Sequence, residues 1–174
     1  MPTLSDIKTF FFLNDGTCAG SDQGLGQKEV SLNDKDRQEA EKAGKILVGY
    51  EIASLCFSPL VRTQQIAQII AKHCHCGLYP IDDFKKDQLK VADEKLLPDA
   101  EGRKEFGNRV MSGLNSLLDY PLPILIISHA EVLKIICTDL EVDYPDISSE
   151  KGIIHFFQRL GRWVAKPLEI SSGN

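Results

Sequence analysis

The stretch FFFLNDGTCAG, residues 10–20, runs from apolar residues into a polar pair and a glycine. Such a run predicts a buried strand, and strands of α/β proteins present reactive groups at their carboxyl ends. Asn14 offers an amide there, and Asp15 offers a carboxylate that can act as a base, a nucleophile or a ligand-binding group. Gly16 follows and allows the backbone to turn. The first strand therefore predicts a site built on Asn14, Asp15 and Gly16.

A second predicted strand also ends shortly before a charged residue that could bind a ligand. Residues 52–57 (IASLCF) predict a strand that stops at Ser58 and Pro59, with the proline suited to a first helical turn. Ser58 is interpreted as a turn residue. Arg62 falls in the first turn of the next helix, where a cation and the helix amino terminus together favour an anion. We therefore assign Arg62 to the predicted site.

The third polar strand end follows LPILIIS, residues 122–128, the most apolar strand of the chain. Such a strand is typical of the centre of a parallel sheet. His129 stands at its carboxyl end, before a short helix at residues 131–140. Because the carboxyl ends of parallel strands meet at one crevice, we expect Asp15, Arg62 and His129 to lie together there.

The remaining pattern alternates strands and helices over one domain, residues 1–174. We expect a three-layer α/β/α fold with a mainly parallel sheet and an antiparallel edge strand. The first strand is expected over residues 8–14 and another strand over 77–81. Helices are expected after an N-cap at Asn33, up to about Lys72, and from about Asp99 to Leu118. A hairpin is expected around Leu160 and Gly161.

The composition of the chain excludes some classes of binding partner. The 174 residues are 43% hydrophobic and 26% charged, with a formal charge of −5, which favours a globular protein without a nucleic-acid footprint. No apolar run approaches the ~20 residues that span a bilayer, and the amino terminus does not resemble a signal peptide. Five cysteines, an odd count, form no paired framework. We expect a cytoplasmic protein that binds neither nucleic acid nor membrane.

The cluster His73-Cys74-His75-Cys76 has metal-binding residue types. Alternate residues of an extended segment point to opposite faces, whereas structural zinc needs four converging ligands. We interpret the cluster as a chance grouping at a helix end and expect neither a metal nor a cofactor. Cys56, Cys137 and His155 lie among apolar residues, and we expect them to be structural.

Five segments, which follow one another along the chain in the order of the family, resemble the histidine phosphatase superfamily, whose members are phosphoglycerate mutase-like. FLNDG stands where the family has a strand ending in Arg-His-Gly, and SPLVRTQQIA resembles its Ser-x-Leu-x-Arg-Ala-x-Gln-Thr-Ala motif. IISHAEVLKII resembles its Val-Ser-His-Gly strand and helix. SLNDKDRQEAEKAGKIL and HFFQRLGRWVAKPLE resemble a helix and the closing hairpin of the family.

The resemblance implies specific roles. In the family the first-strand histidine becomes phosphohistidine, while two arginines and a second histidine hold the phosphoryl oxygens. Arg62 matches the second arginine and His129 the second histidine, whereas Asn14 replaces the first arginine and Asp15 replaces the nucleophile. Ala130 replaces the glycine after the second histidine.

The general acid of the family has its best-aligned candidate in Asp83, with Asp82 next. Asp15, His129 and Asp83 are thus the catalytic candidates, and Asn14, Arg62 and Gly16 the binding candidates. NDGT also resembles a motif of haloacid dehalogenase-like phosphatases. The nucleophile of that motif would fall at Leu13, whose side chain cannot act as a nucleophile.

Asp15 argues against the usual phosphohistidine reaction. Two unit charges ~4 Å apart interact by about 4 kcal/mol at an effective dielectric of 20, so a carboxylate repels phosphate. Removal of a catalytic nucleophile can cost about 10⁶ in turnover. We expect a degenerate member that serves as a binding or regulatory module, with a weakly bound small anionic or phosphorylated ligand or a protein partner. The alternative is a phosphatase or other hydrolase with rebuilt chemistry on Asp15 and His129, with or without a metal.

Overall fold

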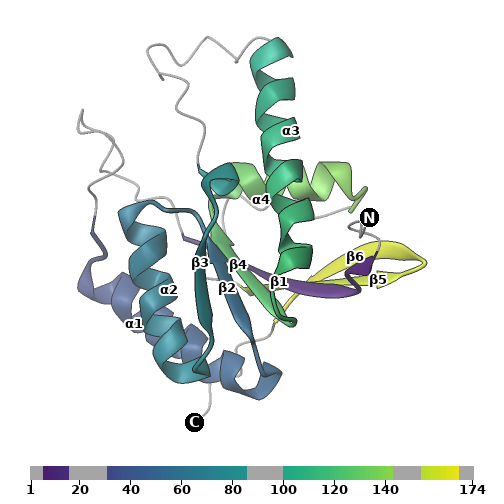
Figure 1. The fold of residues 1–174 in the computed structure, drawn as a ribbon. Coiled ribbons are helices and arrows are strands. Elements are labelled where there is room, and N and C mark those ends of the chain that lie inside the picture. Colours follow the sequence, from purple (N-terminus) through teal and green to yellow (C-terminus); the bar gives the residue numbers. More distant parts are fainter. Residues whose placement is uncertain (1–5, 16–30, 86–99, 143–153, 169–174) are drawn as a thin grey trace.

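A six-stranded mixed sheet organises the chain (Figure 1). The computed structural model describes residues 6–15, 31–85, 100–142 and 154–168. The strand order is β3-β2-β4-β1-β5-β6, in which β3, β2, β4 and β1 are mutually parallel. β5 pairs with β1 in the antiparallel direction, and β6 pairs with β5 in the same way. The strands are β1 (Thr9–Asn14), β2 (Ser54–Phe57), β3 (Gly77–Pro80), β4 (Ile124–Ser128), β5 (Ile154–Leu160) and β6 (Arg162–Pro167).

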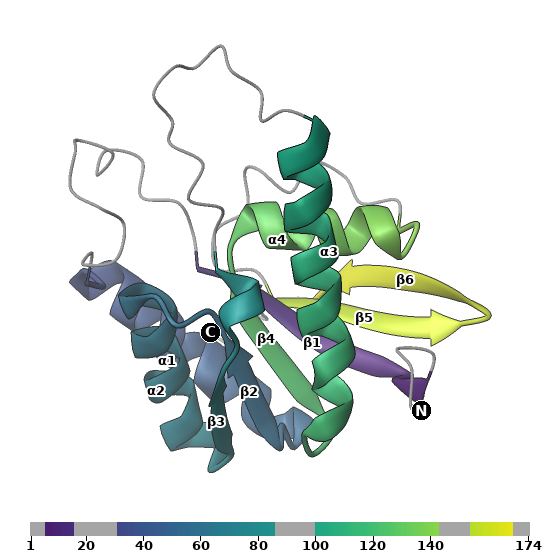
Figure 2. The same ribbon diagram turned by 45° about the horizontal axis from the view of Figure 1, so that its top comes forward.

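Helices cover both faces of this sheet. One side carries α1 (Asp34–Leu47) and α2 (Val61–Cys74), and the other carries α3 (Ala100–Ser116) and α4 (Ala130–Asp139) (Figure 1, Figure 2). Three short 3₁₀ segments are η3 (Val48–Tyr50), η4 (Asp82–Phe84) and η5 (Leu117–Asp119). The expected three-layer α/β/α fold with an antiparallel edge is therefore confirmed, including the central place of β4.

Strand alternation explains the two cores. In β1, Phe10 and Phe12 pack in the cluster that includes α3 and α4, whereas Phe11 and Leu13 pack in the cluster with α1 and α2. Successive side chains of a strand point to opposite faces, so one apolar run can supply both layers. Full burial of each such side chain contributes about 1.5–3 kcal/mol. The continuous apolar sequence of β1 thus fits a strand covered on both faces.

Helix and turn boundaries follow local chemistry. The side chain of Asn33 accepts a hydrogen bond from the backbone N–H of Asp36 at 2.8 Å, which confirms the predicted N-cap of α1. His75 ends α2 in the left-handed region at φ 52°. Gly161 links β5 to β6 at φ 77°, a conformation that glycine adopts without steric cost, and the predicted hairpin is confirmed.

Most boundaries differ from the sequence-based ones by one or two residues. The second strand begins at Ser54 rather than residue 52, because only Ser54–Phe57 pair with both neighbours. The helix expected to continue to Leu118 ends as α3 at Ser116 and tightens into η5. Among the described residues, no helix combines the length and apolar character that a bilayer crossing requires.

Candidate active site

The site lies where three adjacent parallel strands end. The register pairs Phe57 with Ile127 and Asn14 with Ser128, so β2, β4 and β1 finish side by side. The ladder continues one residue further on both sides of β4. The N–H of Ser58 donates to the carbonyl of Ile127 at 3.0 Å, and the N–H of Asp15 donates to that of Ser128 at 2.9 Å. Sheet pairing therefore fixes the backbone that carries each side chain.

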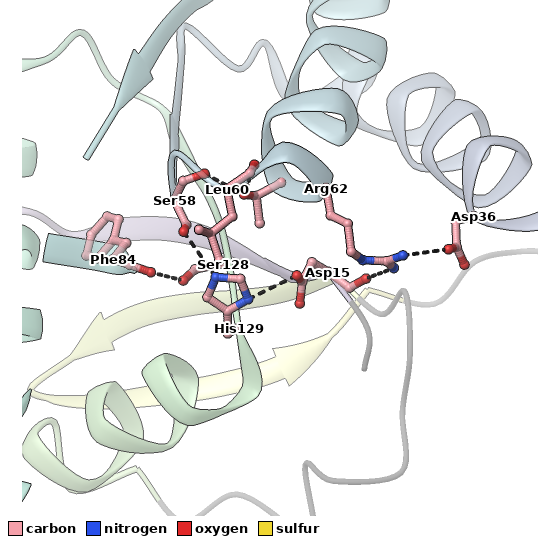
Figure 3. A network of polar contacts seen from close by, with 9 residues as sticks. Asp15, Asp36, Ser58, Leu60, Arg62, Phe84, Ser128 and His129 are labelled. Atoms are coloured by element: carbon pink, nitrogen blue, oxygen red, sulfur yellow. Dashed lines mark hydrogen bonds and ion pairs between the residues drawn. The ribbon is translucent and has the colours of Figure 1, made fainter. Parts of the chain in front are cut away.

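Figure 3 shows His129 between Asp15 and Ser58. Oδ2 of Asp15 lies 3.0 Å from Nδ1 of His129, and Oγ of Ser58 lies 3.0 Å from Nε2 of the same ring. The side chains of His129 and Asp15 are only 7% and 8% exposed, and Ser58 is fully buried. Both ring nitrogens of His129 thus have protein partners.

These partners determine where the protons lie. An ionised carboxylate only accepts hydrogen bonds, so Nδ1 of His129 carries the proton that faces Asp15. In the neutral ring, Nε2 then accepts the hydroxyl proton of Ser58. A serine hydroxyl can both donate and accept, so Ser58 also suits the charged ring. The side chains of Asp15 and Ser58 therefore fix the tautomer of the neutral imidazole.

Arg62 joins the cluster from the first turn of α2 (Figure 3). One terminal nitrogen, Nη2, donates to the backbone carbonyl of Asp15 at 3.0 Å. The other, Nη1, lies 3.0 Å from Oδ2 of Asp36, whose side chain is 21% exposed in the first turn of α1. The expected meeting of Asp15, Arg62 and His129 is confirmed. The Asp15 carboxylate itself faces His129, while Arg62 contacts the backbone carbonyl of Asp15.

Two hydroxyls brace this cluster. Oγ1 of Thr63 donates to the carbonyl of Ser58 and lies 2.8 Å from that of Leu60, so the turn between β2 and α2 is tied to the helix. Oγ of Ser128 donates to the carbonyl of Phe84 at 2.8 Å, which links the end of β4 to η4. The network is therefore connected on both sides to fixed backbone.

Asn14 is 6% exposed at the last position of β1, and by strand alternation it lies on the same sheet face as Phe10 and Phe12. Gly16, with the expected Gly-rich rim at residues 16–26, lies outside the described residues. The binding roles of Asn14 and Gly16 both stay predictions.

Asp83 lies in η4, next to the residue whose carbonyl contacts Ser128. Its described contacts are with α3. Its carbonyl accepts from Nη1 of Arg109 at 2.9 Å, and its Cβ would lie 2.8 Å from a Cβ placed on Gly113. Asp82 is exposed and pairs with Lys85 at 2.6 Å. The assignment of either residue as a general acid stays a prediction.

Sequence reasoning missed two participants. Ser58 lies in the turn between β2 and α2 as predicted, but its hydroxyl also contacts His129, a contact that the sequence reasoning does not predict. Asp36 received no role, yet it pairs with Arg62. The position of Ser58 directly after a buried strand, as for Asp15 and His129, was the available signal. The strand order that makes these ends adjacent is absent from the sequence pattern.

Burial shifts the pKa of several titratable groups that are not members of this cluster. Burial lowers the pKa of His155 to about 4 and raises the pKa values of Cys56 and Cys137 to about 12 and 11. These groups are therefore neutral near pH 7. His73 lies in the last turn of α2, with its Nε2 2.5 Å from the carboxylate of Glu41 on α1. Within the described ranges, no three His, Cys, Asp or Glu side chains are arranged to hold a metal ion.

Comparisons with known proteins agree with the fold. The sequence profile of the histidine phosphatase superfamily (branch 1) matches residues 16–85. The Bacillus stearothermophilus protein YhfR has a similar structure, with a TM-score of 0.71 at 18% identity over 90% of this chain and 94% of that one. A mycobacterial glucosyl-3-phosphoglycerate phosphatase in complex with inorganic phosphate gives 0.68 at 12% identity over 94% and 96%.

A curated relative is considerably longer. Agropine synthesis reductase of Rhizobium rhizogenes is 29% identical over 156 residues, which are 83% of this chain but only 35% of the reductase. The chain therefore spans about a third of that relative. Taken together, the profile match over residues 16–85 and the sheet order show that this chain is similar to the histidine phosphatase superfamily and has the fold of the solved structures it resembles.

Proposed function

We propose that this protein is a divergent histidine phosphatase-fold protein that forms no phosphohistidine and acts as a binding or regulatory module. The observation that carries the proposal is the contact between Asp15 and His129. Asp15 stands where the resemblance expects the nucleophilic histidine, and its carboxylate engages the second histidine instead of leaving it to a phosphoryl group.

The charges around the cluster support this proposal. Nη1 and Nη2 of Arg62 already contact Asp36 and the carbonyl of Asp15, and both nitrogens of His129 have partners. A phosphate would have to displace these contacts and approach the Asp15 carboxylate. Repulsion of about 4 kcal/mol between unit charges ~4 Å apart opposes that approach. We therefore expect a phosphorylated small ligand to bind weakly.

A module role also agrees with the lengths of the relatives. About two thirds of the agropine synthesis reductase has no counterpart in the matched segment. A domain of this fold that accompanies a larger protein can bind a ligand or a protein partner without performing the reaction itself. This supports an accessory function for the fold when its phosphohistidine chemistry is lost.

A second candidate is a hydrolase with rebuilt chemistry, and one observation favours it. Asp15, His129 and Ser58 form a continuous series of contacts, from carboxylate to imidazole to hydroxyl. Such a series can move a proton and activate a hydroxyl without a phosphohistidine.

Phosphatase assays and phosphoenzyme trapping test the main proposal. The natural chain is incubated with p-nitrophenyl phosphate, with and without Mg²⁺ or Mn²⁺, and acid-labile phosphoryl groups on the protein are then measured. We expect no turnover at family rates and no phosphohistidine. Metal-free turnover that is lost in Arg62→Ala, or a trapped phosphohistidine, would overturn the proposal.

A further inference from the structure

Three neighbouring strand ends deliver a serine, a histidine and an aspartate in spatial order. Ser58 follows β2, His129 follows β4 and Asp15 follows β1, and β4 lies between the other two strands. The separations are 3.0 Å from Oγ to Nε2 and 3.0 Å from Nδ1 to Oδ2. Serine-histidine-aspartate triads on unrelated folds share this arrangement, in which each ring nitrogen faces a different partner.

The backbone of Ser58 is suited to a nucleophile. Ser58 lies in the short turn from a parallel strand into a helix, the position that the nucleophile occupies in α/β-hydrolases. Its N–H is bonded to Ile127, and its carbonyl accepts from Thr63. Because both ends of the residue are held, its hydroxyl is directed at His129 without further rearrangement (Figure 3).

Donors for a developing oxyanion come from the same helix. The residue after Ser58 is Pro59, which has no N–H, so the next residue cannot supply a donor as it does in α/β-hydrolases. The N-cap of α2 is Leu60, which forms no side-chain cap. The first-turn N–H groups of this 14-residue helix therefore lack a cap from that residue, and the helix dipole adds partial positive charge beside Ser58.

We propose that Ser58 is the nucleophile of an acyl-transfer reaction on small, uncharged carboxylic esters; this inference rests on the second candidate function, the hydrolase with rebuilt chemistry. Oγ of Ser58 forms a bond to the ester carbonyl carbon while its proton passes to Nε2 of His129. The bond from carbon to the alcohol oxygen breaks, and that oxygen takes the proton from Nε2. Water then hydrolyses the acyl-serine through the same histidine and releases the acid.

Burial and charge select the substrate class. Ser58 is fully buried and His129 is almost so, which restricts the acyl group to a small one. The carboxylates of Asp15 and Asp36 disfavour an anionic ester, whereas a neutral one meets no such repulsion. Asp15 holds the imidazole in the tautomer that accepts the Ser58 proton, so it acts here as a positioning residue.

Labelling of the natural chain tests the inference directly. Diisopropyl fluorophosphate, a small neutral reagent for activated serines, is added, and the modified peptide is identified by mass spectrometry. Release of p-nitrophenol from p-nitrophenyl acetate is followed in parallel. We expect modification at Ser58 and an initial burst close to one equivalent. Modification only at other residues, or none, would overturn the inference even if the variants below failed to fold.

Two variants and a control separate the chemistry from folding. Ser58→Ala should abolish the burst, and Asp15→Asn should slow acylation by about 100-fold or more, because the wrong tautomer then faces Ser58. Ser54→Ala is the matched control, since Ser54 is an equally buried serine at the opposite end of β2 whose hydroxyl contacts Pro121. It should leave the burst unchanged, and an equal loss in Ser54→Ala would contradict a role for Ser58.

The outcomes distinguish this inference from the main proposal. Labelled Ser58 without phosphohistidine supports acyl transfer and the second candidate function, and it overturns the module role while leaving the absence of phosphohistidine in place. Unlabelled Ser58 without phosphohistidine overturns acyl transfer alone and leaves a binding or regulatory module. A trapped phosphohistidine overturns the main proposal, whichever residue the fluorophosphate modifies.

Discussion

The Asp15 carboxylate and the His129 imidazole lie 3.0 Å apart at the ends of two neighbouring parallel strands, with both side chains almost completely buried. The family resemblance expects two histidines to face a phosphoryl group at this position. Here an internal acid faces the imidazole. The aspartate at position 15 therefore changes which group the imidazole of His129 contacts.

Removal of the Asp15 carboxylate should destabilise the fold. Asp15→Ala leaves Nδ1 of His129 buried without its acceptor, and an unsatisfied buried polar group costs about 1–3 kcal/mol. Asp15→Asn keeps a hydrogen-bonding group beside Nδ1, because its amide can donate to the other tautomer of the ring, so it should cost less. Urea unfolding at pH 7 gives both free energies. Equal stability of the natural chain and Asp15→Ala would show that the contact contributes nothing.

Asp36→Asn should improve phosphate binding slightly. It removes the carboxylate that engages Nη1 of Arg62, and because this pair is partly exposed, the gain should be about 2- to 5-fold in Kd. Asp34→Asn is the matched control, since it makes the same charge change on an exposed residue of the same helical turn. Calorimetric titration with orthophosphate measures the Kd of each variant and of the natural chain. Equal gains in the two variants would indicate a general charge effect rather than release of Arg62.

His155 should make stability fall at acidic pH. Its folded pKa of about 4 lies below the ordinary value of 6.5, so the unfolded chain binds the extra proton between these pH values. Stability should therefore be unaffected above about pH 6.5 and decrease as pH falls towards 4, by up to about 3 kcal/mol for this group.

Unfolding curves recorded from pH 7 to pH 4 test that behaviour. His155→Gln should show a flatter dependence than the natural chain, because the titrating group is gone. His75→Asn is the control, since His75 is exposed and asparagine tolerates its left-handed backbone. A pH dependence that is unchanged in His155→Gln would assign the effect to other groups.

Much of the fold could be predicted because its signals are local. The apolar run of β4, the cap at Asn33 and the turn at Gly161 each depend on a few neighbouring residues. Strand order is not local, and the roles of Ser58 and Asp36 depend on it. Ser58 contacts a residue 71 positions away, and Asp36 pairs with one 26 positions away.

The Asp15 substitution is visible in the sequence, and so is the expected grouping of Asp15 with Arg62 and His129. Which of the two the carboxylate faces depends on side-chain geometry. The carbonyl of Asp15 accepts from Arg62, and this leaves the carboxylate to face His129. A backbone contact of this kind has no sequence signal, since every residue carries a carbonyl group.

Titration of phosphate or vanadate into the natural chain and into the double variant Asn14→Arg/Asp15→His tests the central claim most directly. The claim is that the internal carboxylate prevents the site from working as a phosphoryl site. The double variant restores two donors and removes the repulsion, so it should bind at least about 10-fold more tightly than the weakly binding natural chain. Tight binding by the natural chain that the double variant weakens would contradict the account.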